Sequence, residues 1–289
     1  MDNSYPLVSV LMTSYNRGKF IAEAINSVLN SSYTHFELII VDDCSTDNTV
    51  AIAQSFATYD NRVKVYQNEK NLGDYPNRNK AASYAKGIYL KYLDSDDIIF
   101  PDGLAYCVEQ MMQFPEASLG MLYLRDRHMH NSLMMSSGEA IRHHFFDGSV
   151  LSIGPSGSIF KRDLFEKIKG FNTGYGVASD NMFNLEMAIH TPVVFFNQVF
   201  FDYRIHDAQE NKNEKGYLVQ NYRYNKDILD HPQLPLTQKQ KLYLRRKLEK
   251  RFMVNIAGYA IRIKNPASAT EIIRLTGFKW WNIYKYIFY

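Results

Sequence analysis

Short runs of apolar, often β-branched residues alternate with longer segments of mixed polarity through the first hundred residues of the chain. The short runs have the length and composition of buried strands, and the longer segments repeat their apolar residues at helical spacing. This alternation is typical of βαβ units, so it predicts an α/β fold with a mostly parallel sheet flanked by helices. The predicted strands are 7–13, 36–42, 62–67 and 87–94, and the predicted helices lie near 18–30, 47–58 and 76–86.

The pattern changes twice farther along the chain. Residues 125–148 mix Met, His and polar residues without a period, so no element is predicted there, whereas the pattern after Gly216 is helical. We therefore predict an α/β domain at 1–215 and a C-terminal helical extension at 216–289. The other predicted elements are a helix near 102–114, an apolar run at 119–124, a turn, short strand and helix start at 154–165, a glycine-rich loop within 174–190 that enters a helix at about Asp180, and a last strand at 199–207.

Composition and charge narrow the class of protein. A chain of 289 residues with 46% hydrophobic and 22% charged content can bury a large core. Its two cysteines, Cys44 and Cys107, form no disulfide framework, and no signal peptide is apparent at the start, so a cytosolic location is favoured. The chain lacks a run of about 18 apolar residues, which argues against a membrane-spanning helix.

Polar segments follow three of the predicted strands. They are TSYNR (13–17), DDCSTD (42–47) and DSDD (94–97). In open α/β sheets ligands bind at the carboxyl ends of the strands, where these segments would meet. The carboxylates of DSDD repel one another and lose hydration when enclosed, so they need a compensating partner, for which a divalent cation is the first candidate. The structural alternative is a solvated turn that caps a helix.

Four segments, in order over roughly residues 5–207, resemble the family 2 glycosyltransferases, enzymes of the GT-A fold that use nucleotide-sugar donors. The segments are VSVLMTSYNR, IIVDDCSTDNT, NLGDYPNRNKAASYAKGIYLKYLDSDD and ASDNMF. The resemblance implies a GT-A catalytic domain at 1–215. It also implies an inverting, metal-dependent transfer from a UDP-sugar, with a dTDP-sugar left open, to a hydroxyl of a saccharide or lipid-linked acceptor in bacterial surface polysaccharide synthesis.

The resemblance assigns donor-binding roles to individual residues. Asp43 would accept the N3–H of uracil, with Thr13 and Tyr15 lining the same pocket, and Asp94 would contact the ribose. Arg78 is a diphosphate contact or the partner of one of the aspartates, and the two roles are compatible. An Asx turn is the alternative role for the pair that contains Asp43. The remaining donor-binding candidates are Asn71, Ser95 and Arg204.

The resemblance also implies a metal site and a catalytic base. Asp96 would bind Mn²⁺ or Mg²⁺, and His206 would complete the shell, since neutral imidazole is a competent ligand. Asp180 would remove the proton from the acceptor hydroxyl, and its structural alternative is a helix N-cap. Two departures from the family pattern, Cys44 in place of glycine and Ser179 in place of glutamate, remove none of these side chains.

The C-terminal extension carries a strong positive charge. Residues 237–289 hold twelve Lys or Arg and two Glu, so their charge of +10 exceeds the +3 of the whole chain. Basic clusters and the aromatic segment 278–289 suit the cytoplasmic face of an anionic membrane, where many enzymes of the family find lipid-linked acceptors. The same aromatics suit packing on the catalytic domain or at a homo-oligomer interface, and the sequence leaves these alternatives open.

Other functions are disfavoured by particular residues. A sugar-phosphate nucleotidyltransferase usually has a glycine-rich loop after its first strand, which TSYNRGK lacks. A non-catalytic nucleotide-sugar-binding module is disfavoured because Asp43, Asp96 and Asp180 are all present. A nucleic-acid binder would carry a recognition motif beside its basic charge, and none accompanies the tail. The donor sugar, the acceptor and the linkage are not specified by the sequence.

Overall fold

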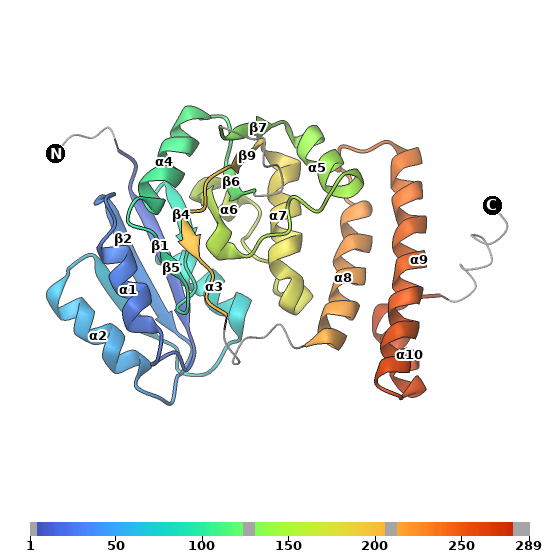
Figure 1. Cartoon of the computed structure of the whole chain (residues 1–289), viewed down its shortest axis with the longest axis horizontal. Helices are drawn as coiled ribbons and strands as arrows, with labels where there is room; N and C mark the ends of the chain where they lie inside the picture. Colours follow the sequence, from blue (N-terminus) through green and yellow to red (C-terminus); the bar gives the residue numbers. More distant parts are fainter. Residues whose placement is uncertain (1–4, 124–130, 206–212, 280–289) are drawn as a thin grey trace.

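An eight-stranded sheet forms the centre of the α/β part of the chain in the computed structural model, which describes residues 5–123, 131–205 and 213–279. Figure 1 shows this sheet with helices on its faces and the last helices stacked at one end. The strand order is β3-β2-β1-β4-β8-β6-β9-β7.

The first half of the sheet is parallel, as its alternating pattern predicts. Successive residues of β1 face opposite sides, so Leu11 joins the core on one side of the sheet while Val10 and Met12 join the core on the other. The strands of this half are β1 (Val8–Ser14), β2 (Phe36–Asp42), β3 (Val63–Gln67) and β4 (Tyr89–Tyr92), and its helices are α1 (Ile21–Leu29), α2 (Thr49–Tyr59) and α3 (Asp74–Ser83).

The second half of the sheet is mixed. Strand β8 runs antiparallel to both β4 and β6, β6 runs parallel to β9, and β7 closes the edge antiparallel to β9. The strands are β6 (Leu119–Leu122), β7 (Leu133–Met135), β8 (Ser158–Lys161) and β9 (Val193–Phe196), and the helices are α4 (Gly103–Gln113), α5 (Ser137–Phe146), α6 (Arg162–Lys167) and α7 (Ser179–His190), with 3₁₀ turns η1 (Pro155–Gly157) and η2 (Thr173–Ala178).

The last predicted strand does not join the main sheet. In the described part of the predicted strand 199–207, residues 199–205, only the two-residue strand β10 (Phe201–Asp202) forms, and it pairs with β5 (Ile98–Ile99). The buried strand β9 was not predicted, although Pro192 separates it from α7, because four apolar residues are too few to show a strand period. The unassigned stretch 125–148 contains β7 and α5, the latter begun by a capping box between Ser136 and Glu139.

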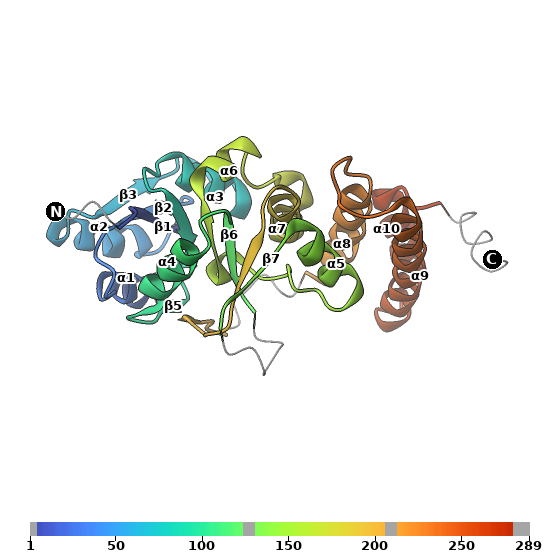
Figure 2. The same ribbon diagram turned by 90° about the horizontal axis from the view of Figure 1, so that it is seen from above.

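The C-terminal extension is helical, as predicted, and consists of α8 (Glu214–Leu229), α9 (Gln238–Arg262) and α10 (Pro266–Thr276). Ile228 and Leu229 of α8 and Leu244 of α9 belong to the same buried cluster as the sheet, so the extension packs on the α/β domain. Figure 2 shows the three helices stacked beyond α7. Within the described residues, no helix is both long and apolar enough to cross a membrane.

Candidate active site

The polar segments that follow β1, β2 and β4 meet at one edge of the sheet, as their order predicted. The side chains of Ser14 and Asp42 hydrogen bond across neighbouring strand ends at 2.9 Å. Asp42 also accepts the backbone N–H of Ser45 at 2.8 Å, so this carboxylate holds the turn after β2. The Asx-turn role therefore describes Asp42.

The buried carboxylate of Asp43 organises the neighbouring loop. It accepts hydrogen bonds from Nδ2 of Asn68 at 2.7 Å and from the backbone N–H groups of Leu72 and Gly73 at 2.8 and 2.9 Å. A carboxylate has roughly four lone-pair positions, so three internal donors leave capacity for one ligand N–H. This loop-holding role was not predicted from the sequence, because it depends on a contact with a residue 29 positions away.

The backbone after Asp43 explains one departure from the family pattern. Cys44 has a φ of 68°, in the left-handed region where glycine is favoured and a side chain is strained. The resemblance described from the sequence implies glycine at this position, which suits a residue with a positive φ.

Arg78 is buried at the centre of an ion-pair network. Its Nε contacts Oδ1 of Asp74 at 2.8 Å and its Nη1 contacts Oδ1 of Asp94 at 2.6 Å. The guanidinium lies 5.7 Å from the ring centroids of both Tyr75 and Tyr92. The aspartate partnership predicted for Arg78 is therefore present, and the diphosphate contact stays a prediction.

Replacing Arg78 by methionine should lower the free energy of unfolding by about 3 kcal/mol, because it leaves two carboxylates beside a low-dielectric site without their cation. Urea denaturation measures this change. The matched control is Arg262→Met, which removes a surface pair with Glu214 whose partners are 63% and 47% exposed, and which should cost under about 1 kcal/mol. Equal losses in both variants would contradict the central role of Arg78.

The DSDD carboxylates cluster as predicted. Ligand oxygens of Asp94, Asp96 and Asp97 lie within 4.8 Å of one another. Oδ2 of Asp97 is buried and has no hydrogen-bond partner within the described residues. Burial, with the charges of Asp94 and then Asp96, raises the pKa of Asp97 to about 7. A buried carboxylate oxygen without a partner and an excess of negative charge fit a divalent cation, for which carboxylate oxygens are the preferred ligands.

Arg17 is a partner of this cluster that the sequence analysis missed. Its Nε contacts Oδ2 of Asp96 at 3.1 Å, with both side chains largely buried. The two residues are 79 positions apart, so only the parallel pairing of β1 and β4 brings them together. A guanidinium at this oxygen offsets part of the negative charge that a metal would otherwise neutralise.

Lys91 is a second missed cation, directly beneath the aspartates. It is fully buried, and its Nζ donates to the carbonyl oxygens of Tyr92 and Ser156 at 2.7 and 2.6 Å. Burial lowers the pKa of Lys91 to about 8. Oγ of Ser156 in turn accepts the backbone N–H of Asp94 at 3.0 Å. A lysine within an apolar predicted strand was the available sequence signal.

Arg204 binds protein groups around the same loop. Its Nε donates to the carbonyl oxygen of Asp96, its Nη1 pairs with Glu23 of α1, and its backbone N–H donates to Oδ1 of Asp97 at 3.3 Å. These contacts fasten the chain after β10 to the aspartate loop. His206, the second predicted metal ligand, lies outside the described residues.

Asp180 is the second residue of α7 and does not cap it. The N-cap position is Ala178, and no side chain makes a capping hydrogen bond there. Oδ1 of Asp180 instead accepts the backbone N–H and the Nδ2 of Asn181 at 2.7 and 3.0 Å. The neighbouring Ser179 is fully buried, and its Oγ donates to the carbonyl of Asn172 at 2.9 Å.

The electrostatic surroundings of Asp180 place it beside the Arg78 network. Burial raises the pKa of Asp180 to about 6, the charges of Arg78 and Asp74 act on it in opposite directions, and Tyr75 contributes a hydrogen bond that lowers it. A carboxyl with this pKa is a base that is ionised near neutral pH yet strong enough to accept a proton. The alternative role as an N-cap is not what the structure has.

The remaining candidates surround the same edge of the sheet. Thr13 is half-buried and is the second-to-last residue of strand β1, and Tyr15 is exposed in the loop that follows the strand. Oδ1 of Asn71 accepts the backbone N–H of Gly73 at 3.0 Å, and Ser95 is buried between the first two aspartates of DSDD. Their roles in donor binding stay predictions.

The sheet carries carboxylates at the ends of its parallel strands, which is the edge where open α/β sheets bind their ligands. Residues 9–169 match the family model described as "Glycosyl transferase family 2", which is more than half of the chain. The chain therefore belongs to glycosyl transferase family 2, and its class is that of the glycosyltransferases.

Relatives and solved structures agree with this assignment. TuaG of Bacillus subtilis, named as a glycosyltransferase of teichuronic acid biosynthesis, is 46% identical over 113 residues, which are 39% of this chain and 45% of TuaG. The chain thus matches under half of the length of that relative.

Among solved structures, Staphylococcus aureus TarS in complex with UDP-GlcNAc aligns with a TM-score of 0.67 at 18% identity, covering 83% of this chain and 71% of that one. The mannosyltransferase PcManGT of Pyrobaculum calidifontis, in complex with GDP-Man and Mn²⁺, aligns with a TM-score of 0.59 at 17% identity, covering 98% and 84%. Both share the fold.

Proposed function

We propose that the chain is an inverting, metal-dependent glycosyltransferase that moves a sugar from a UDP-sugar to a hydroxyl of a saccharide or lipid-linked acceptor in bacterial surface polysaccharide synthesis. The observation that carries the proposal is the grouping of Asp180 with the Arg78–Asp94 pair and the DSDD carboxylates at one edge of the sheet. The UDP-GlcNAc complex of TarS and the biosynthetic role in the name of TuaG support the donor and the pathway class. A dTDP-sugar remains the alternative donor.

On the donor side, the residues of this chain bind and orient the nucleotide. Asp43 accepts the N3–H of the base, and Asp94 contacts the ribose. Arg78 is hydrogen bonded to Asp94, and from this position its guanidinium contacts the diphosphate. Asp96 and His206 would hold Mn²⁺ or Mg²⁺. When bound there, the cation supplies Lewis-acid neutralisation of the charge that develops on the departing diphosphate.

On the acceptor side, Asp180 acts as the general base. Its carboxylate takes the proton of the acceptor hydroxyl while that oxygen forms a bond to the anomeric carbon. The bond between the anomeric carbon and the diphosphate oxygen breaks on the opposite face, and its electron pair leaves with the UDP. One displacement of this kind inverts the configuration, so a single base is sufficient.

The raised pKa of Asp180 gives the reaction a defined acid limb. We expect kcat/KM to rise tenfold per pH unit below about pH 6 and to level off above it, because only the ionised carboxylate accepts the proton. The raised pKa of Asp180 also makes the stability of the folded state depend on pH, and stability falls where activity rises. The folded state holds this proton more tightly than the unfolded chain, so the stabilisation is full below about pH 4 and is lost as the pH rises through about 6. A pH-rate profile that stays flat between pH 5 and 8 would contradict the assignment.

Calorimetric titration of the protein with UDP, dTDP, GDP and ADP, each with and without Mn²⁺, tests the proposed function. Binding of UDP that requires Mn²⁺, together with release of UDP from a UDP-sugar, is the expected result. Binding of UDP-sugars without any turnover would favour a non-catalytic nucleotide-sugar-binding module. Release of pyrophosphate from UTP and a sugar 1-phosphate would favour a nucleotidyltransferase.

A cytoplasmic location, with attachment to the inner face of the cell membrane, is a further part of this proposal. The charge of +10 over residues 237–289 supports attraction to anionic lipid, although packing of α8 and α9 on the α/β domain accounts for part of the apolar surface of the extension. Flotation with vesicles of anionic and of neutral lipid measures the attachment. Equal recovery of the protein with anionic and with neutral vesicles would show that the positive charge of the extension does not cause attachment to the membrane.

A further inference from the structure

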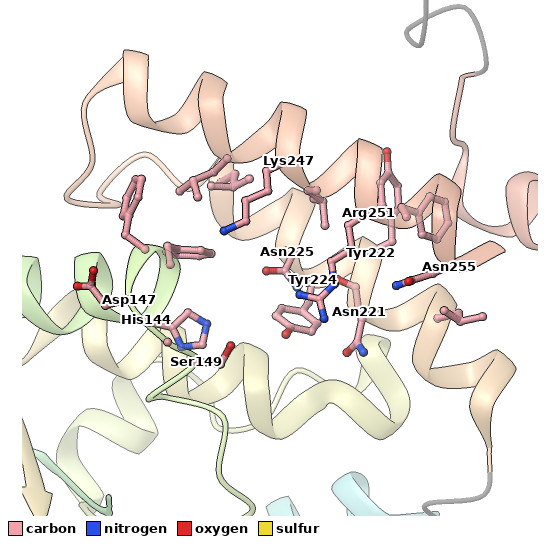
Figure 3. A pocket seen from close by; sticks show the side chains of 18 residues that line it. His144, Asp147, Ser149, Asn221, Tyr222, Tyr224, Asn225, Lys247, Arg251 and Asn255 are labelled. Atoms are coloured by element: carbon pink, nitrogen blue, oxygen red, sulfur yellow. Dashed lines mark hydrogen bonds between the residues drawn. The ribbon is translucent and has the colours of Figure 1, made fainter. Parts of the chain in front are cut away.

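A cavity of about 470 Å³ lies where the C-terminal extension meets the α/β domain (Figure 3). Its walls are α8, α9 and the segment 144–149 at the end of α5. The volume falls within the range of small-ligand sites and is wide enough for a sugar with a charged substituent. None of the residues predicted from the sequence to bind the donor lines this cavity.

The charge of the cavity is positive. Figure 3 shows the ammonium group of Lys247 and the guanidinium group of Arg251 directed from α9 toward α8, one helical turn apart. Both residues are exposed, and neither makes a hydrogen bond or ion pair with a protein group among the residues that the structure describes. Asp147 is the one acidic residue in the lining, and its carboxylate contacts His143 at 3.2 Å. Two cations that lack protein partners in one cavity favour an anionic ligand.

The rest of the lining suits a sugar ring. The amide side chains of Asn221 and Asn255 lie beside Arg251, and an amide both donates to and accepts from hydroxyl groups. The buried ring of Tyr224 forms part of the wall and offers an apolar face. Cations, amides and an aromatic ring in one cavity are the groups that would recognise an acidic saccharide.

The cavity adjoins the segment that carries the candidate base. The 3₁₀ turn η2 leads directly into Asp180, and the hydroxyl of its residue Tyr175 donates to Oδ2 of Asp227 on α8 at 2.9 Å. Tyr224 of the same helix lines the cavity, and the charges of Asp180 and Arg251 act on its pKa in opposite directions. The cavity and the segment that carries the candidate base are therefore connected through α8.

We propose that this cavity holds the acceptor saccharide through an anionic substituent, a phosphate or a carboxylate, which Lys247 and Arg251 bind. This inference rests on the proposed function, because it assigns the cavity to the acceptor of that reaction. It makes α8 and α9 part of the substrate site and explains why the extension packs on the catalytic domain through α8. A sugar phosphate and a uronic acid share the required chemistry.

Direct binding of simple sugars tests the proposal. The full chain, saturated with UDP and Mn²⁺ to fill the donor site, is titrated with N-acetylglucosamine 1-phosphate, glucuronic acid and uncharged N-acetylglucosamine, and the binding is measured by saturation-transfer NMR. We expect one of the two anionic sugars to bind and the uncharged sugar to bind at least tenfold more weakly. Binding of the phosphate or of the carboxylate probe identifies which anion the site prefers.

Variants of α9 locate that binding. Arg251→Gln and Lys247→Gln should each weaken binding of the anionic sugar by about tenfold, because each variant loses one charge-assisted hydrogen bond. The matched control is Lys250→Gln, an exposed lysine on the same helix that does not line the cavity, and it should bind like the unchanged protein. Thermal melting checks that all three variants fold.

Two results would overturn the inference. One is equal affinity for the charged and uncharged sugars, or no binding of either anion. The other is an equal effect of Arg251→Gln and Lys250→Gln. Failure of the proposed function is seen separately, because a protein that binds no nucleoside diphosphate in the calorimetric titration fails before any sugar is added.

Discussion

Replacing Asp180 by asparagine is expected to lower kcat for sugar transfer by roughly 10²- to 10⁴-fold while leaving UDP binding unchanged. Asparagine keeps an acceptor oxygen for the N–H of Asn181 but cannot take a proton from the acceptor. The loss should therefore fall on the chemical step. Initial rates at saturating donor, together with UDP calorimetry on the same protein, measure the two effects.

The chain offers a matched control for this variant. Asp163 is also the second residue of a helix, α6, and its Oδ1 likewise accepts the backbone N–H of the next residue, Leu164, at 2.6 Å. It is exposed and belongs to no candidate site. Asp163→Asn should retain full activity. If Asp180→Asn retained activity as well, the base would have to be sought elsewhere.

Replacing Asp96 by alanine is expected to abolish the dependence of UDP binding on Mn²⁺ and to weaken binding in the presence of the metal by at least about 100-fold. A metal bridge to the diphosphate is worth several kcal/mol, and each tenfold change corresponds to about 1.4 kcal/mol. UDP titration with and without Mn²⁺ measures both changes. Asp102→Asn, on an exposed aspartate at the N-cap of α4 that makes no capping bond, is the control.

Because Arg17 contacts Asp96, this carboxylate has two possible roles, positioning the arginine and binding the metal, and the Arg17→Gln variant separates them. If the carboxylate serves mainly to position this arginine, UDP will bind equally well with and without metal, and Arg17→Gln will weaken it as much as Asp96→Ala. If the carboxylate binds metal, Arg17→Gln will leave the Mn²⁺ dependence in place. The two variants therefore separate neutralisation by a metal from neutralisation by a guanidinium.

Local sequence patterns were sufficient for the first half of the fold. The strand predicted at 36–42 has those same bounds in the structure, and the other three early strands differ only at their ends. Strands β1, β2 and β4 are buried on both faces, so their apolar runs are nearly continuous and their boundaries fall at polar segments, whereas β3 at the edge of the sheet is largely exposed. The same pattern predicted that the polar segments after the strands meet, and Asp94, Asp96 and Asp97 do cluster in the structure, whereas the roles of single residues came from the family resemblance.

In the second half of the sheet, the turn, short strand and helix start predicted at 154–165 are η1, β8 and α6, but neither strand β9 nor the pairing of these strands was predicted. Strands β8 and β9 have four residues each, and β8 pairs antiparallel with β4 across about 70 residues of sequence. A short buried strand has the same apolar pattern as one turn of a buried helix, so periodicity does not distinguish them. Its place in the sheet depends on partners that are distant in sequence.

For the site, the sequence is sufficient to predict which acidic groups are available and that Asp43, Asp94, Asp96 and Asp180 lie at the ends of strands or the start of a helix. The cations that accompany these groups are set by the packing of the folded chain. Arg17, Arg78 and Lys91 meet the aspartates through strand pairing and burial, and the α8–α9 cavity exists only because distant helices pack together. This difference arises from the distance along the chain over which each interaction acts. Periodicity and turn chemistry act over a few residues, whereas a charge acts on whatever the fold brings within several ångströms, and burial strengthens that effect.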